Sequence, residues 1–66
     1  MSELILSSGC IVLIEGFDDI PEHQFLVDEV FDYFITGKAL TGPLAGEYGE
    51  PEITLVLEVL SVSRVG

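Results

Sequence analysis

The chain has 66 residues, of which 12 are acidic and two are basic, giving a net charge of −10 at pH 7. A single cysteine, Cys10, excludes an internal disulfide, and a single histidine, His23, excludes a zinc site of the usual Cys/His kind within one chain. The charge argues against broad electrostatic binding of nucleic acid, which needs Lys and Arg at the phosphates. We expect one domain over residues 1–66 with no cofactor and no metal ion.

The composition is apolar for so small a chain. Hydrophobic residues make up 48%, more than a core of this size can hide, so we expect the excess to lie at an interface between copies. No window reaches the roughly 18 apolar residues of a membrane span. The N-terminal stretch carries Glu3 and no basic residue, unlike a secretory signal. With a reduced Cys10, this indicates a cytoplasmic protein with no membrane partner.

The first predicted element is a buried strand. Ile11-Val12-Leu13-Ile14 is a β-favouring run bounded by Gly9 and Gly16. Cys10 is expected to be a buried small hydrophobe, because a reactive thiol needs a positive charge nearby. The polar connection 17–23 holds the turn-forming residues Asp and Pro, and we expect His23 to lie there at the surface.

Residues 24–40 allow two interpretations. Strand-favouring Phe, Val, Tyr, Ile and Thr dominate, which favours a pair of strands. One face of that pair would carry Phe25, Val27, Phe31, Tyr33 and Ile35. Residues 21–36 also fit a helix, with Pro21 in its first turn and Gly37 as its C-terminal stop. We favour the strands and keep the helix as the alternative.

The last third of the chain is a loop followed by a strand. Loop 41–51 is rich in Gly and Pro and lacks the lysine of a phosphate-binding loop. In 52–65 both faces of the expected strand are apolar, with Ile53 and Leu55 on one and Val56 and Leu60 on the other. Such a strand needs cover on both sides, from a curled barrel or from a neighbouring subunit.

One motif suggests a family. Phe31-Asp32-Tyr33-Phe34-Ile35-Thr36 is similar to the Phe-Asp-x-x-Met-Asn stretch of the Sm/LSm-like proteins, with Thr36 in place of Asn. Ser63-Arg64-Val65-Gly66 is similar, more loosely, to the Ile-Arg-Gly element of that family. The chain length and the order of apolar segments also resemble the family.

The resemblance implies an all-β fold, a small, strongly bent five-stranded Sm/SH3-like barrel that assembles as a homo-oligomeric ring through its edge strands. It implies a non-catalytic protein in which single-stranded RNA or DNA contacts Asp32, Tyr33, Thr36 and Arg64.

A different class of function follows from the charge. Carboxylates cluster along the chain, for example Asp18 and Asp19 with Glu22. They could hold a divalent cation, but we interpret them as solvated surface charge. An acidic protein-interaction module, or a mimic of nucleic acid, is therefore the alternative to the RNA-binding ring. An enzyme is the least favoured class, because His23 has no recognisable nucleophile partner.

Overall fold

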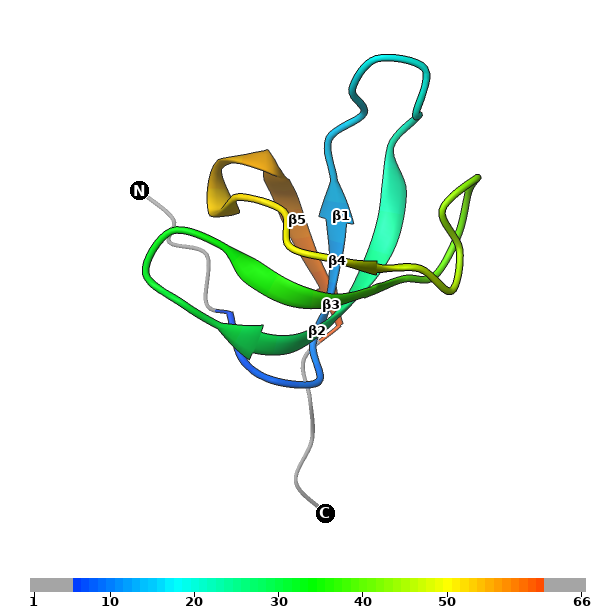
Figure 1. The fold of residues 1–66 in the computed structure, drawn as a ribbon. Helices are drawn as coiled ribbons and strands as arrows, with labels where there is room; N and C mark the ends of the chain where they lie inside the picture. Colours follow the sequence, from blue (N-terminus) through cyan, green and yellow to red (C-terminus); the bar gives the residue numbers. More distant parts are fainter. Residues whose placement is uncertain (1–5, 62–66) are drawn as a thin grey trace.

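A computed structural model describes residues 6–61 as one antiparallel sheet with the strand order β4-β3-β2-β1-β5 (Figure 1). The strands are β1 (Ile11–Ile14), β2 (His23–Val30), β3 (Ile35–Ala39), β4 (Tyr48–Gly49) and β5 (Val56–Ser61), with a 3₁₀ turn, η1 (Ile53–Leu55), before β5. The all-β prediction is confirmed. Strands β4 and β5 are the two edges of the described sheet and do not pair with each other.

Strands β2 and β3 form the hairpin that the sequence favoured, so the helical alternative for residues 21–36 is wrong. Along β2, His23, Phe25 and Val27 are buried, and the residues between them are exposed. This alternation has the two-residue period of a strand. In a helix, Phe25 and Val27 would lie about 200° apart around the axis and could not share one core.

The chain reverses direction at residues 31–34, between β2 and β3. The Phe31 N–H donates to the Phe34 carbonyl oxygen at 2.9 Å, and a bulge at Asp28 shifts the register just before the turn. The prediction that Phe31 and Tyr33 share one strand face with Phe25 and Val27 is therefore wrong, because both lie in the turn. The Tyr33 side chain is 81% exposed.

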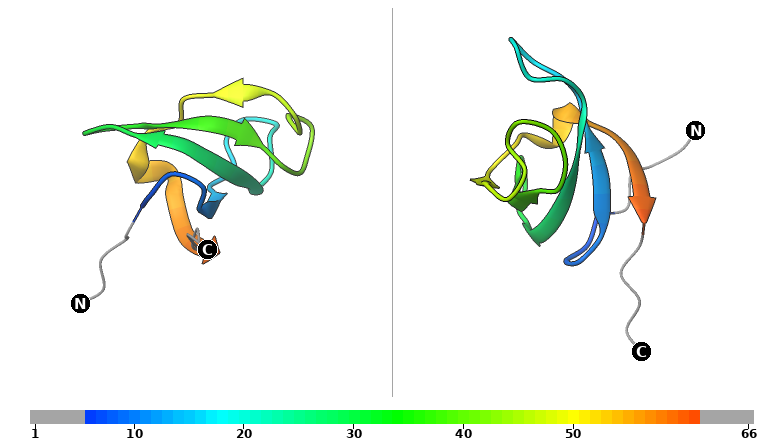
Figure 2. Two further views of the ribbon diagram at one scale, coloured as in Figure 1. Left: turned by 90° about the horizontal axis from the view of Figure 1, so that it is seen from below. Right: turned by 90° about the vertical axis from the view of Figure 1, so that its right-hand side faces the viewer.

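The core lies on the inner face of a strongly bent sheet (Figure 2), with β2, β3 and β4 on one side and β1 and β5 on the other. Its buried apolar members come from β1, β2, β3, β5 and the residue before β1: Cys10, Val12, Ile14, Phe25, Val27, Ile35, Ala39 and Val56. The prediction that Cys10 is a buried small hydrophobe is confirmed, because its side chain has no exposed surface.

His23 is buried, so the prediction of a surface histidine is wrong. Strand β2 begins at this residue and places its side chain on the same face as Phe25. The imidazole is 4% exposed, and its Nδ1–H donates to the Pro21 carbonyl oxygen at 2.9 Å. The Phe17 ring lies edge-on with its centroid 6.4 Å away. A neighbouring carbonyl satisfies the buried ring, as buried polar groups require.

The C-terminal strand begins later than expected and is irregular. Residues 53–55 form η1 instead of strand, held by hydrogen bonds from Ile53 N–H to the Tyr33 carbonyl (2.9 Å) and from Glu15 N–H to the Leu55 carbonyl (2.8 Å). Strand β5 then pairs with β1 through two register shifts, which leave Leu57 and Leu60 without a partner. These two bulged leucines are 45% and 42% exposed.

Candidate binding surfaces

The β2–β3 turn brings two of the four predicted contact residues together at the surface. Asp32 and Tyr33 are adjacent at its tip, and both are exposed. They are flanked by Phe31 and Phe34, whose rings stack with centroids 4.9 Å apart and planes 19° from parallel. Such a pair contributes roughly 0.5–1.5 kcal/mol beyond its buried area. The turn therefore exposes the Asp32 carboxylate and the Tyr33 phenol to solvent, next to the stacked rings of Phe31 and Phe34.

The other two predicted residues do not join this pair. Thr36 lies in β3 opposite Glu29 and is only 5% exposed. Arg64 lies outside the described residues. Of the four predicted contact residues, only Asp32 and Tyr33 are therefore both described and exposed at the turn.

The described acidic residues lie at the surface, as the sequence predicted. Of the 12 acidic residues, Glu3 lies outside the described part, and the other eleven are all exposed. These are Glu15, Asp18, Asp19, Glu22, Asp28, Glu29, Asp32, Glu47, Glu50, Glu52 and Glu58. Within residues 6–61 no three His, Cys, Asp or Glu side chains come together in a way that could hold a metal ion. The carboxylates are therefore available to a partner in solution.

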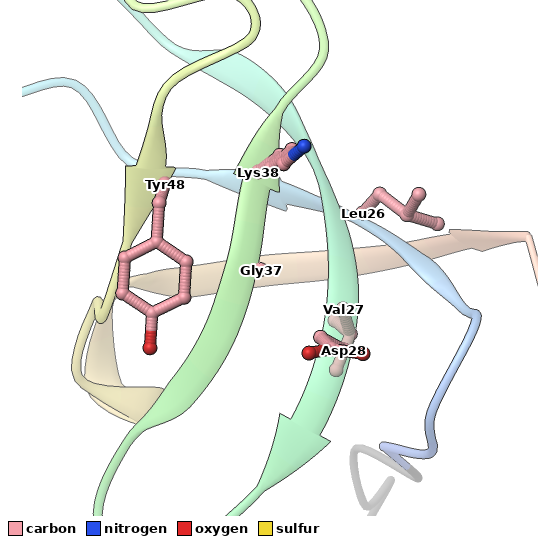
Figure 3. Close-up of a pocket in the computed structure, with 6 residues that line it drawn as sticks. All are labelled: Leu26, Val27, Asp28, Gly37, Lys38 and Tyr48. Carbon is pink, nitrogen blue, oxygen red and sulfur yellow. The ribbon is translucent and has the colours of Figure 1, made fainter.

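A groove of about 310 Å³ crosses β2, β3 and β4 (Figure 3). It is lined by Leu26, Val27, Asp28, Gly37, Lys38 and Tyr48. The sequence raised Tyr48 only as one of several aromatic residues that could stack on a base, and it did not single out Lys38. The one available signal was Gly37, because a glycine inside a strand often marks a close approach of another backbone or a ligand.

Tyr48 is held by its neighbour on the chain. Its hydroxyl donates to Glu50 Oε2 at 3.0 Å. This hydrogen bond to a carboxylate is the main cause that raises the pKa of Tyr48, and the side chain of Thr36 acts in the opposite direction. The Tyr48 hydroxyl thus lies at one wall of the groove and donates to Glu50.

Comparison of the chain with family models, curated proteins and solved structures gives no match. Between residues 6 and 61 there is also no helix long and apolar enough to cross a membrane. The function is therefore argued from the surfaces described above.

Proposed function

We propose that this chain is a non-catalytic interaction domain that binds a basic protein through its acidic surface. The supporting observation is the exposure of all eleven described carboxylates, against which residues 6–61 offer only Lys38 as a cationic side chain. A field of one sign attracts a partner of the opposite sign over a distance and accelerates association. The same field repels the phosphates of nucleic acid.

The carboxylates are grouped in three places, which makes the proposal specific. One group is Asp18, Asp19 and Glu22 at the tip between β1 and β2, a second is Asp28, Glu29 and Asp32 around the next turn, and a third is Glu47, Glu50 and Glu52 around β4. Each exposed ion pair contributes only about 0–1 kcal/mol. A true binding site therefore needs several carboxylates of one group to act together.

Three matched variants test this proposal, each replacing the three carboxylates of one group by the corresponding amides. Binding of a fluorescent Lys/Arg-rich peptide is measured by anisotropy at low and at high salt. We expect one variant to lose most of the affinity and the other two to lose little, and we expect added salt to weaken the wild-type complex. Equal losses in all three variants would show only a general attraction of charges and would contradict the proposal.

A second candidate is the Sm-like homo-oligomeric ring that binds single-stranded RNA or DNA. Two observations support it: β4 and β5 are open edges of the described sheet, and the Tyr33 ring is free to stack on a base. Head-to-tail pairing of β5 with β4 of the next copy would join the sheets of successive copies into a ring. In this candidate Asp32, Tyr33 and Arg64 carry the contact, and Thr36, which lies on the same face of β3 as Lys38 but is only 5% exposed, would have to be uncovered to join them.

The ring is tested by mass and by nucleic-acid binding. Light scattering should give several times the 7.2 kDa of one chain. Binding of a short single strand should change little with salt, because few phosphates are neutralised. It should fall in Tyr33→Ala and persist in Tyr48→Ala, the matched control. Absence of nucleic-acid binding at low salt would rule out this candidate. The features that would prevent edge pairing between copies are the short β4 and the bulged β5.

A further inference from the structure

A second depression in the surface lies beside the bulged end of β2. This depression, which we call the bulge hollow, has a volume of about 460 Å³ and is lined by Ser8, Asp28, Glu29, Val30 and Phe31, all of them exposed. Ser8 belongs to the turn before β1, and a hydrogen bond from the Gly9 N–H to the Val27 carbonyl oxygen (2.7 Å) holds that turn against β2. The bulge hollow is therefore built by two segments that are distant in sequence.

The bulge brings two neighbouring carboxylates to the same hollow. Successive side chains of a regular strand point to opposite faces of the sheet, yet Asp28 and Glu29 both line the bulge hollow. The register shift between Val27 and Glu29 breaks the alternation at this point, and bulges re-aim side chains in this way next to functional sites. None of the five lining residues is basic. The two like charges therefore repel each other, and a bound cation relieves that repulsion.

An aromatic ring forms the apolar side of the bulge hollow. Phe31 is 44% exposed, and its stack on Phe34, with centroids 4.9 Å apart, restrains the ring. The face of an aromatic ring carries negative potential and attracts a cation that lies within about 6 Å of its centroid. Val30 adds aliphatic surface next to the ring. The hollow thus combines negative charge, an aromatic ring and apolar surface.

This combination selects one kind of cation. A metal ion finds no set of three His, Cys, Asp or Glu side chains among residues 6–61. A lysine ammonium is compact and strongly hydrated, so it gains little from apolar surface. An arginine guanidinium is planar and weakly hydrated, binds a carboxylate through two parallel N–H donors and stacks on aromatic rings. The guanidinium group is therefore the cation that uses every side of the hollow.

We propose that the bulge hollow binds one arginine side chain of a basic protein. This inference rests on the proposed function and assigns its main contact to the second group of carboxylates, Asp28, Glu29 and Asp32. The groove beside the third group contains Lys38, which repels a cation. In the first group the adjacent Phe17 ring packs edge-on against His23. The second group offers the guanidinium a hollow, two carboxylates and a ring together.

Two peptides of equal length and charge test the proposal, one with arginine at every basic position and the other with lysine. Fluorescence anisotropy at one fixed salt concentration gives the ratio of their dissociation constants. The wild-type chain should bind the arginine peptide about three- to tenfold more tightly. Phe31→Leu should bring this ratio close to one, because leucine keeps apolar contact and removes the ring. Phe31→Tyr keeps the ring and should preserve the ratio.

Phe17→Leu is the matched control for the ring. Phe17 is 43% exposed, almost as much as Phe31, and it also lies next to a group of carboxylates, so its replacement should leave the ratio unchanged. Glu29→Gln and Glu47→Gln are matched in charge. We expect Glu29→Gln to weaken binding of the arginine peptide at least about twofold more than Glu47→Gln. Circular dichroism checks that each variant is folded.

The outcomes separate this inference from the proposed function. A wild-type ratio close to one, or a Phe31→Leu ratio equal to that of the wild type, would overturn the arginine assignment and leave the binding of a basic partner in place. Equal losses for Glu29→Gln and Glu47→Gln would also overturn it, because the contact would then lie outside the bulge hollow. Failure of both peptides to bind at low salt would contradict the proposed function itself.

Discussion

Gly37 on β3 lies so close to Leu26 on β2 that a Cβ at the glycine would overlap the Leu26 carbonyl oxygen. The same Cβ would come within 2.9 Å of the Phe25 ring. No side chain can be accommodated there without separating the two strands. The missing side chain is thus what lets the central hairpin close over the core.

Gly37→Ala should therefore be severely destabilising, by about 3 kcal/mol or more, because the clash involves backbone that cannot move aside. Gly46→Ala is the informative control. Gly46 has φ +85° but nothing within 4 Å of an added Cβ, so that variant tests backbone strain alone, at about 1–2 kcal/mol. Urea unfolding followed by circular dichroism measures both. A smaller loss of unfolding free energy for Gly37→Ala than for Gly46→Ala would show that β2 and β3 can separate at little cost in free energy.

The thiol of Cys10 should be protected in the folded protein, because its side chain is fully buried. We expect an aromatic disulfide reagent to modify it slowly under native conditions and rapidly in denaturant. The native rate should follow the stability of the domain, since reaction requires opening. Rapid modification under native conditions would mean that the strand entering β1 opens without global unfolding.

Tyr48 should titrate above the ordinary phenol pKa of 10.0, chiefly because of its hydrogen bond to Glu50. The folded state favours the protonated phenol, so the associated stability is complete below pH 10.0 and is lost as the pH rises through the folded pKa. In a Tyr33→Phe background Tyr48 is the sole tyrosine, and ultraviolet absorbance reports it directly. Glu50→Gln should lower the pKa. An unchanged titration curve would show that the hydrogen bond is not formed in solution.

The stack of Phe31 on Phe34 should stabilise the β2–β3 turn. We expect a double-mutant cycle with Phe31→Leu and Phe34→Leu to give a coupling energy of about 0.5–1.5 kcal/mol. Leucine keeps the apolar character and removes the ring, so the cycle isolates the aromatic contact. Additive losses would indicate that the rings are not in contact in solution.

Several elements could be predicted because their signals are local. A β-branched run between two glycines identifies β1, and two-residue alternation identifies β2. The turn at 31–34 had only a weak signal. Asp32 is its one turn-favouring residue, with no Gly, Pro or Asn beside it, and a ring stack with one backbone hydrogen bond closes the turn.

The errors at η1 and His23 have a tertiary cause. Ile53 and Thr54 favour strands, but hydrogen bonds to Tyr33 and Glu15, both distant in sequence, hold this segment as a turn. His23 is buried because its position in β2 and the Pro21 carbonyl accommodate it. For the candidate site, sequence reasoning placed Asp32 and Tyr33 in a shared element but could not reveal that Thr36 is covered and only 5% exposed.

The pairing of β1 with β5 has a consequence for the order of folding. Strand β1 ends at Ile14, yet one of its two neighbours begins only at Val56. A partly folded chain in which β5 has not yet docked would leave the apolar β1 edge bare. Such long-range pairing slows folding, and bare strand edges recruit other chains. Docking of β5 is therefore the folding step that protects this chain from aggregation.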